Sequence, residues 1–276
     1  MTGTKQAPLH QIADRAKADR LAFYMLKGMN KTIRKYRMLL NGDRLLVAVS
    51  GGKDSLSLLD LLYRRRRSAR ERVTVIACHV RSDHHCGRAV SEEWLTTYCL
   101  ERGIPLHTVP ITVAETLSQA KRSRCFWCSY RRRTALFQLA DQLGCNRIAL
   151  GHHADDIAET TLMNLCFSGR VQRMEPKQIL FKGRLTLIRP LAMTEERDIA
   201  DLARASGFPV GGEPCPDGIN SRRALVKNVL RELESDSINV KRSIFHAVER
   251  CQRAIQTTQP KQPSGNEEQG QEEDHV

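Results

Sequence analysis

Short apolar runs alternate with longer amphipathic segments along most of the chain. The apolar runs lie at 45–49, 73–78, 106–109 and 147–150. Segments with helical spacing follow them at 56–62, 92–100, 136–143 and 157–167. Continuous apolar runs are typical of strands buried on both faces, and alternation with helices is typical of βαβ units. The pattern therefore predicts an α/β fold with a doubly wound, mostly parallel sheet.

The pattern changes on both sides of this region. Apolar runs at 179–181 and 185–188 flank Lys182-Gly183-Arg184 and predict a hairpin. Further helices are predicted at 195–206, 221–234 and 241–255. Residues 11–40 also have an imperfect helical stripe, with Gly28 as a candidate break. The expected organisation is a basic N-terminal helical extension, a central domain, a C-terminal helix and a disordered acidic tail, at 1–40, 41–235, 236–258 and 259–276.

The chain is strongly basic, with a formal net charge of +13. Because residues 260–276 hold five acidic residues and one lysine, the folded part is more basic still. This balance favours a polyanionic partner, above all nucleic acid, over a merely soluble basic surface. Two readings stay open for the basic faces of 11–40: contact with RNA phosphates, or a solvated helix packed on the core.

Targeting signals are not evident in the sequence. It has no run of eighteen apolar residues and no signal peptide, so a cytoplasmic protein without a membrane partner is expected. Its nine cysteines are then expected to be reduced, which makes clustered ones candidates for metal or redox chemistry.

The first chemical signal is the run Ser50-Gly51-Gly52-Lys53-Asp54-Ser55 between an apolar strand and a helix. Adjacent glycines let the backbone approach a ligand, and the free N–H groups of a first helical turn favour an anion. Lys53 adds a cation, and Ser50 and Ser55 add hydroxyls. The run predicts a phosphate cradle; an ordinary turn with Asp54 as helix N-cap is the alternative.

The spacing excludes the common P-loop, because Val47 stands where its first glycine belongs and Asp54 follows the lysine. The run instead resembles the Ser-Gly-Gly-x-Asp-Ser signature of the PP-loop ATP pyrophosphatase superfamily. That resemblance implies cleavage of ATP between its α and β phosphates and transfer of AMP to a substrate oxygen.

The second signal is Cys125-Phe126-Trp127-Cys128, which arginines surround on both sides. Two cysteines at this spacing can bind one metal or cluster, and positive charge favours thiolates. No second Cys-x-x-Cys completes a four-ligand zinc site. With Cys215 from the late Gly- and Pro-rich loop, three cysteines can hold a 4Fe–4S cluster that keeps one iron open.

The third signal is Gly151-His152-His153-Ala154-Asp155-Asp156, between a strand and a helix. Asp155 and Asp156 are candidate ligands for a Mg²⁺ that bridges ATP phosphates. A simple helix cap is the alternative for Asp155.

These motifs, in order and with Ile188-Arg189-Pro190-Leu191, resemble the tRNA 2-thiocytidine synthetase (TtcA) family over residues 41–233. The resemblance implies that 41–235 is a PP-loop ATP-binding and thiolation domain. It implies catalytic roles for Lys53, Asp54, Cys125, Cys128 and Cys215. It further implies nucleotide contacts from the 50–55 run, Gly151 and His152.

The implied reaction is ATP-dependent thiolation of tRNA. A cytidine 2-oxygen is adenylated, and sulfide held at the open iron replaces it to give 2-thiocytidine. The implied cofactors are ATP, Mg²⁺ and a 4Fe–4S cluster. The implied partners are tRNA, a sulfur donor such as a cysteine desulfurase, and a second copy in a homodimer.

One departure concerns the third cluster ligand. The family often has Pro-Cys-x-x-Cys in the late loop, whereas this loop holds only Cys215.

Two alternative functions stay open for the chain. They are another PP-loop tRNA enzyme, such as a uridine thiolase or a lysidine synthetase, and a non-catalytic RNA-binding module with structural zinc.

Overall fold

The structure is a computed structural model that describes residues 13–83, 90–113, 124–208, 221–237 and 239–258. Cys215 and the predicted acidic tail lie outside these ranges, so their predictions are not tested by the fold.

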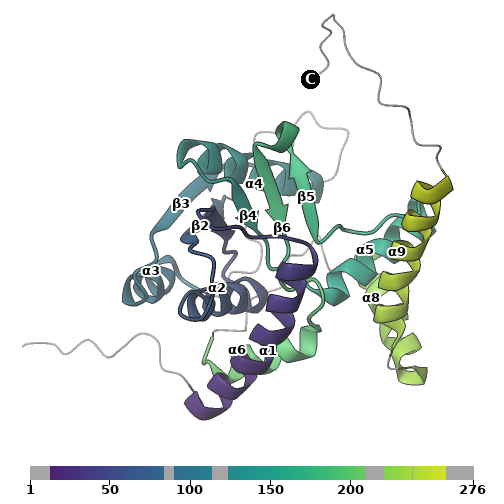
Figure 1. Ribbon diagram of the computed structural model, residues 1–276, viewed down its shortest axis with the longest axis horizontal. Coiled ribbons are helices and arrows are strands. Elements are labelled where there is room, and N and C mark those ends of the chain that lie inside the picture. Colours follow the sequence, from purple (N-terminus) through teal and green to yellow (C-terminus); the bar gives the residue numbers. More distant parts are fainter. Residues whose placement is uncertain (1–12, 84–89, 114–123, 209–220, 238, 259–276) are drawn as a thin grey trace, which may run out of the picture.

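A six-stranded sheet forms the centre of the molecule, with the strand order β3-β2-β1-β4-β6-β5 (Figure 1). Five strands are parallel, and β5 pairs antiparallel with β6. The strands are β1 (Arg44–Ala48), β2 (Thr74–Ser82), β3 (Leu106–Ile111), β4 (Arg147–Ala149), β5 (Lys177–Leu180) and β6 (Leu185–Ile188). The predicted doubly wound sheet and the predicted hairpin are both confirmed.

The helices lie on both faces of the sheet and at one side of it (Figure 1). They are α1 (Arg15–Lys35), α2 (Lys53–Arg65), α3 (Glu92–Glu101), α4 (Arg124–Gln142), α5 (Ala154–Ser168), α6 (Glu196–Ala205), α8 (Arg222–Asp236) and α9 (Val240–Thr258). None of these helices combines the length and the apolar character that a membrane span requires.

Successive residues of β1 point into two different cores. Leu45 and Val47 pack with apolar residues of α1, α2, α3 and α6 on one face. Leu46 packs on the other face with Leu136 and Ala140 of α4. This alternation follows from the pleat of a strand, whose side chains point to opposite faces in turn. A continuous apolar run therefore fills both cores.

Helix α1 runs through Gly28 without interruption, so the predicted break there is wrong. A glycine costs a helix interior about 1 kcal/mol relative to alanine, which packing can offset. Met25 and Met29 on either side of Gly28 are buried in the main core. Their burial holds the helix straight across the weak position.

Candidate active site

Two loops meet at the point where the strand order of the sheet changes direction. From β1 the chain proceeds to β2 and β3 on one side, whereas β4 and β6 lie on the other. Ligands of open α/β sheets bind at such a switch point, outside the carboxyl ends of the strands. The 50–55 run follows β1, and Gly151 to His153 follow β4, its parallel neighbour. The pairing brings two of the sequence motifs to one crevice.

The turn after β1 has the geometry of an anion cradle. Gly51 has a φ of +87°, and a Cβ there would lie 2.7 Å from Cγ2 of Val90. Gly52 is the N-cap of α2, without a side-chain capping bond, so the first-turn N–H groups of this helix are not capped by that residue. Asp54 lies inside the first turn, which excludes it as the N-cap. Ser55 braces the turn, because its Oγ accepts a hydrogen bond from the Ser50 N–H at 3.1 Å and donates to the Gly52 carbonyl at 3.0 Å.

Gly151 lets the second loop approach the first. A Cβ on Gly151 would lie 3.0 Å from the backbone nitrogen of Ser55 and 3.1 Å from the carbonyl carbon of Asp54. Backbone atoms in a helical turn cannot move aside as the end of a flexible side chain does. A residue without a side chain is therefore required for this contact between the loops.

One cavity of about 840 Å³ connects the motifs. This volume is within the range of small-molecule and cofactor sites. Among its lining residues are most of those that the sequence singled out: Ser50, Asp54, Ser55, Cys125, Cys128, Gly151, His152, Asp156 and Arg189. Four predicted site residues do not line it: Gly51, Gly52, Lys53 and Asp155. Cys215 lies outside the described residues.

Cys125 and Cys128 lie in the first turns of α4, one helical turn apart, and both line the cavity. Cys125 is exposed and Cys128 is buried. Three cationic side chains of the same helix, Arg124, Arg132 and Arg133, line the cavity with them. Positive charge next to a thiol stabilises its thiolate. The helix therefore presents two thiols and a basic wall to the space next to the phosphate cradle.

His152, which is half-buried, and Arg189, which is buried, form a pair in the wall of the cavity. The Arg189 Nε–H donates to His152 Nδ1 at 3.2 Å, and its Nη1 donates to the Glu175 carbonyl. Burial lowers the pKa of His152 to about 4 and that of Arg189 to about 10. His152 is thus neutral at pH 7, and because Nδ1 accepts a bond its proton is on Nε2. The wall holds a neutral imidazole beside a charged guanidinium.

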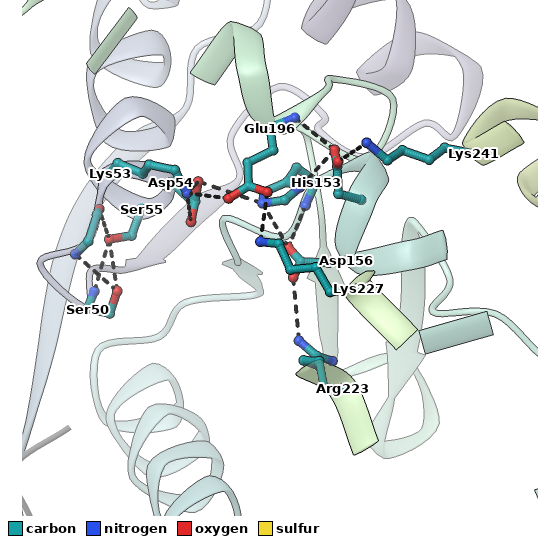
Figure 2. A network of polar contacts seen from close by, with 12 residues as sticks. Ser50, Lys53, Asp54, Ser55, His153, Asp156, Glu196, Arg223, Lys227 and Lys241 are labelled. Atoms are coloured by element: carbon teal, nitrogen blue, oxygen red, sulfur yellow. Dashed lines mark hydrogen bonds and ion pairs between the residues drawn. The ribbon is translucent and has the colours of Figure 1, made fainter. Parts of the chain in front are cut away.

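Lys53 does not line the cavity, and its ammonium lies between two carboxylates. Its Nζ lies 3.0 Å from Asp54 Oδ1 and 3.0 Å from Glu196 Oε1 (Figure 2). Glu196 also pairs with Lys227 of α8 at 2.9 Å. Burial alone would lower the pKa of Lys53, but Asp54 and Glu196 together raise it. The phosphate-binding lysine that the sequence predicts is held as an ammonium by a chain of ion pairs that reaches α8.

The two consecutive aspartates after β4 have different surroundings. Asp156 lines the cavity, and its Oδ2 accepts the His153 N–H at 3.1 Å. Asp155 is directed elsewhere, to Lys241 and to the Glu196 N–H at 2.8 Å. Burial by itself would raise the pKa of Asp155, but His153 and Lys241 hold it well below its usual range. Helical geometry separates neighbouring side chains by about 100°, so only one of the two faces the cavity. The capping carboxylate of this helix is Asp156 and not Asp155. The Mg²⁺ role of the two aspartates stays a prediction.

Residues that the sequence interpretation left out of the site also contribute. Glu196 is 143 positions from Lys53, and no local pattern connects the two. His153 has its Nε2 3.7 Å from Asp54 Oδ1 and 3.4 Å from Asp156 Oδ2, which links the two loops. Arg189, which the sequence marked only as part of the motif Ile188-Arg189-Pro190-Leu191, directly follows β6 at the same edge of the sheet and lines the cavity.

Comparison with known proteins agrees with this geometry. The model of the PP-loop domain family matches residues 25–234. A protein of Geobacter metallireducens named tRNA-cytidine(32) 2-sulfurtransferase is 36% identical over 230 residues, which cover 82% of this chain and 88% of the relative. A protein of the same name from Cellvibrio japonicus is 32% identical over 248 residues, covering 88% and 81%.

Among solved structures, the U34-tRNA thiolase NcsA from Methanococcus maripaludis with its [4Fe-4S] cluster superposes with a TM-score of 0.67. The two chains are 23% identical, and the match covers 85% of this chain and 79% of that one. At this identity the likeness shows a common fold.

Proposed function

The chain belongs to the tRNA-cytidine(32) 2-sulfurtransferase family of PP-loop proteins, and from this premise we propose that it thiolates cytidine 32 of tRNA in an ATP-dependent reaction. The observation that supports the proposal most is the shared cavity. Residues of the phosphate cradle, the two cysteines of α4 and the His152–Arg189 pair all line this cavity. A nucleotide site and a sulfur site can therefore lie next to each other in it.

The residues present fit a nucleotide. The turn after β1, together with the first turn of α2, suits phosphate oxygens, and the helix dipole favours their charge. In this proposal Ser50, Gly52 and Ser55 hold the phosphates. Asp54 and Asp156 replace the predicted aspartate pair as Mg²⁺ ligands, because both line the cavity. Oxygen ligands of this type suit Mg²⁺.

The residues present also fit a cluster. Cys125 and Cys128 face one space and have cationic neighbours, and the proposal takes Cys215 as the third ligand. A 4Fe–4S cluster held by these cysteines would supply an iron able to bind sulfide for transfer.

The first chemical step needs only the nucleotide and the base. The cytosine 2-oxygen forms a bond to the α-phosphorus, the bond from this phosphorus to the bridging oxygen breaks, and pyrophosphate leaves. Backbone N–H groups of the cradle stabilise the developing charge. Arg189 adds a buried cation at the wall, where the low dielectric strengthens its effect. Sulfide then replaces the activated oxygen, which departs with AMP. The target base has to leave its stack to reach the cavity.

The test is mass spectrometry of nucleosides from tRNA incubated anaerobically with the protein, ATP and sulfide. The expected product is 2-thiocytidine, formed together with pyrophosphate and absent when ATP is withheld. A thiolated uridine or lysidine would assign the chain to another PP-loop reaction. Zinc in place of iron, without release of pyrophosphate, would leave an RNA-binding module.

A sulfur donor and a homodimer partner stay predictions. A sulfur donor such as a cysteine desulfurase is tested by replacing sulfide with that enzyme and cysteine. A homodimer is tested by light scattering of the full chain.

A further inference from the structure

Helix α1 exposes a basic and aromatic face that the cavity chemistry does not use. Its apolar side chains Met25, Met29 and Ile33 are buried in the main core. The opposite side therefore faces solvent. The exposed basic residues on α1 that form no ion pair with a described residue are Arg15, Lys17, Arg20, Lys27, Lys31 and Arg34.

The charge of this face is of one sign. Asp19 is the one acidic residue inside α1, and it pairs with Arg64 of α2 at 2.6 Å. At the far end of the helix, Lys35 pairs with Glu249 of α9 at 3.1 Å. The exposed cations on the rest of the helix are therefore available to an anionic partner. Clustered lysines and arginines along one helix are the electrostatic footprint of a nucleic-acid-binding surface.

Two aromatic rings lie within the same face. Phe23 is 55% exposed and Tyr24 is 63% exposed, and their rings meet edge to face at 5.6 Å. The ammonium of Lys27 lies 4.7 Å from the ring centre of Phe23 and 5.9 Å from that of Tyr24. Exposed rings among cations are the surface on which unpaired bases stack while the cations contact phosphates.

We propose that this face, formed by Lys17, Arg20, Phe23, Tyr24, Lys27 and Lys31, is a tRNA-binding surface. Of the two readings that the sequence left open for residues 11–40, the proposal takes contact with RNA phosphates. A membrane-surface helix would need an apolar face directed outward, whereas the apolar stripe of α1 is in the core. The proposal rests on the proposed function, because that function supplies tRNA as the substrate.

The experiment compares variants that remove equal charge. Lys27→Ala/Lys31→Ala removes two cations from the face. Arg67→Ala/Arg70→Ala removes two exposed cations that follow α2, at the edge of the sheet where the strands begin. Alanine favours helix, so α1 is expected to persist, which circular dichroism verifies. The probe is a tRNA transcript with cytidine 32, and affinity is measured by fluorescence anisotropy over a series of salt concentrations.

The slope of log K against log salt is negative, and each lost phosphate contact reduces its magnitude by about one. The lysine pair is therefore expected to reduce this magnitude by about two and the affinity at 0.1 M salt about tenfold or more. The arginine pair is expected to change neither. Tyr24→Ala is expected to weaken binding about tenfold without changing the slope, and Tyr24→Phe to bind like the wild type, because stacking needs only the ring.

An unchanged slope in the lysine pair, or an equal loss in both pairs, would overturn the proposal. So would lysine-dependent binding to phosphatidylserine vesicles with unchanged tRNA binding, which would identify a membrane-surface helix instead. The lysine pair is further expected to raise KM for tRNA and to keep kcat. If the wild type forms no 2-thiocytidine, the proposed function fails, while the binding measurements still decide the role of α1.

Discussion

Replacing Gly151 by alanine tests the contact between the two loops of the active site. The added Cβ would lie 3.0 Å from the Ser55 nitrogen and 3.1 Å from both the carbonyl carbon and the carbonyl oxygen of Asp54. Its φ lies outside the left-handed region, so steric overlap is the only cost of the change. Overpacking of this kind costs about 1–3 kcal/mol, because rigid backbone has to shift. For a domain of this size, each kcal/mol lowers Tm by about 2–4 °C.

We expect Gly151→Ala to unfold about 2–12 °C below the wild type in calorimetry. It should also bind ATP more weakly in titration calorimetry, because the first turn of α2 is displaced. Gly28→Ala is the matched control: a Cβ there has no neighbour within 4 Å, and alanine favours the helix by about 1 kcal/mol. Wild-type Tm and ATP affinity in Gly151→Ala would refute the requirement for glycine at the loop contact.

Three further outcomes follow from the site. Burial alone would raise the pKa of Glu196, but Lys227 and Lys53 lower it from 4.5 to about 2. The stability that Glu196 contributes is therefore present above pH 4.5 and lost as pH falls toward 2. Urea unfolding measured over this range should show a smaller loss of stability in Glu196→Gln than in the wild type. Nitrogen NMR of His152 should show a neutral ring with its proton on Nε2 at pH 6, and titration of the ring near pH 4. A charged ring at pH 6 would contradict the burial of His152 against Arg189. Cys125→Ala, purified anaerobically, should lose iron, whereas Cys251→Ala on the exposed part of α9 should keep it; equal iron in both would remove Cys125 from the cluster.

The alternation of apolar runs and helices was sufficient to predict the sheet, because buried parallel strands have a distinctive composition and length. The phosphate cradle was equally local, since strand, glycines and helix are consecutive in the chain. The ends of the elements were predicted less well from the sequence. Helix α4 begins at Arg124 and so includes both cysteines, although only 136–143 has a clear helical stripe. Gly28 showed the opposite effect, where tertiary packing outweighed a local preference.

The sequence by itself determined the candidate residue types for the site: glycines and serines for phosphate, paired cysteines for a cluster, and an aspartate pair for a cation. These follow from chemistry and short spacing. The tertiary structure decided which of them face one cavity. It directed Asp156 inward and Asp155 toward Lys241, and it tied Lys53 to Glu196 across 143 positions. Such choices depend on helix rotation and on long-range ion pairs, which no local pattern contains. The structure likewise buried the apolar stripe of α1 and left its basic face exposed, and that exposure supports the proposed role in binding tRNA.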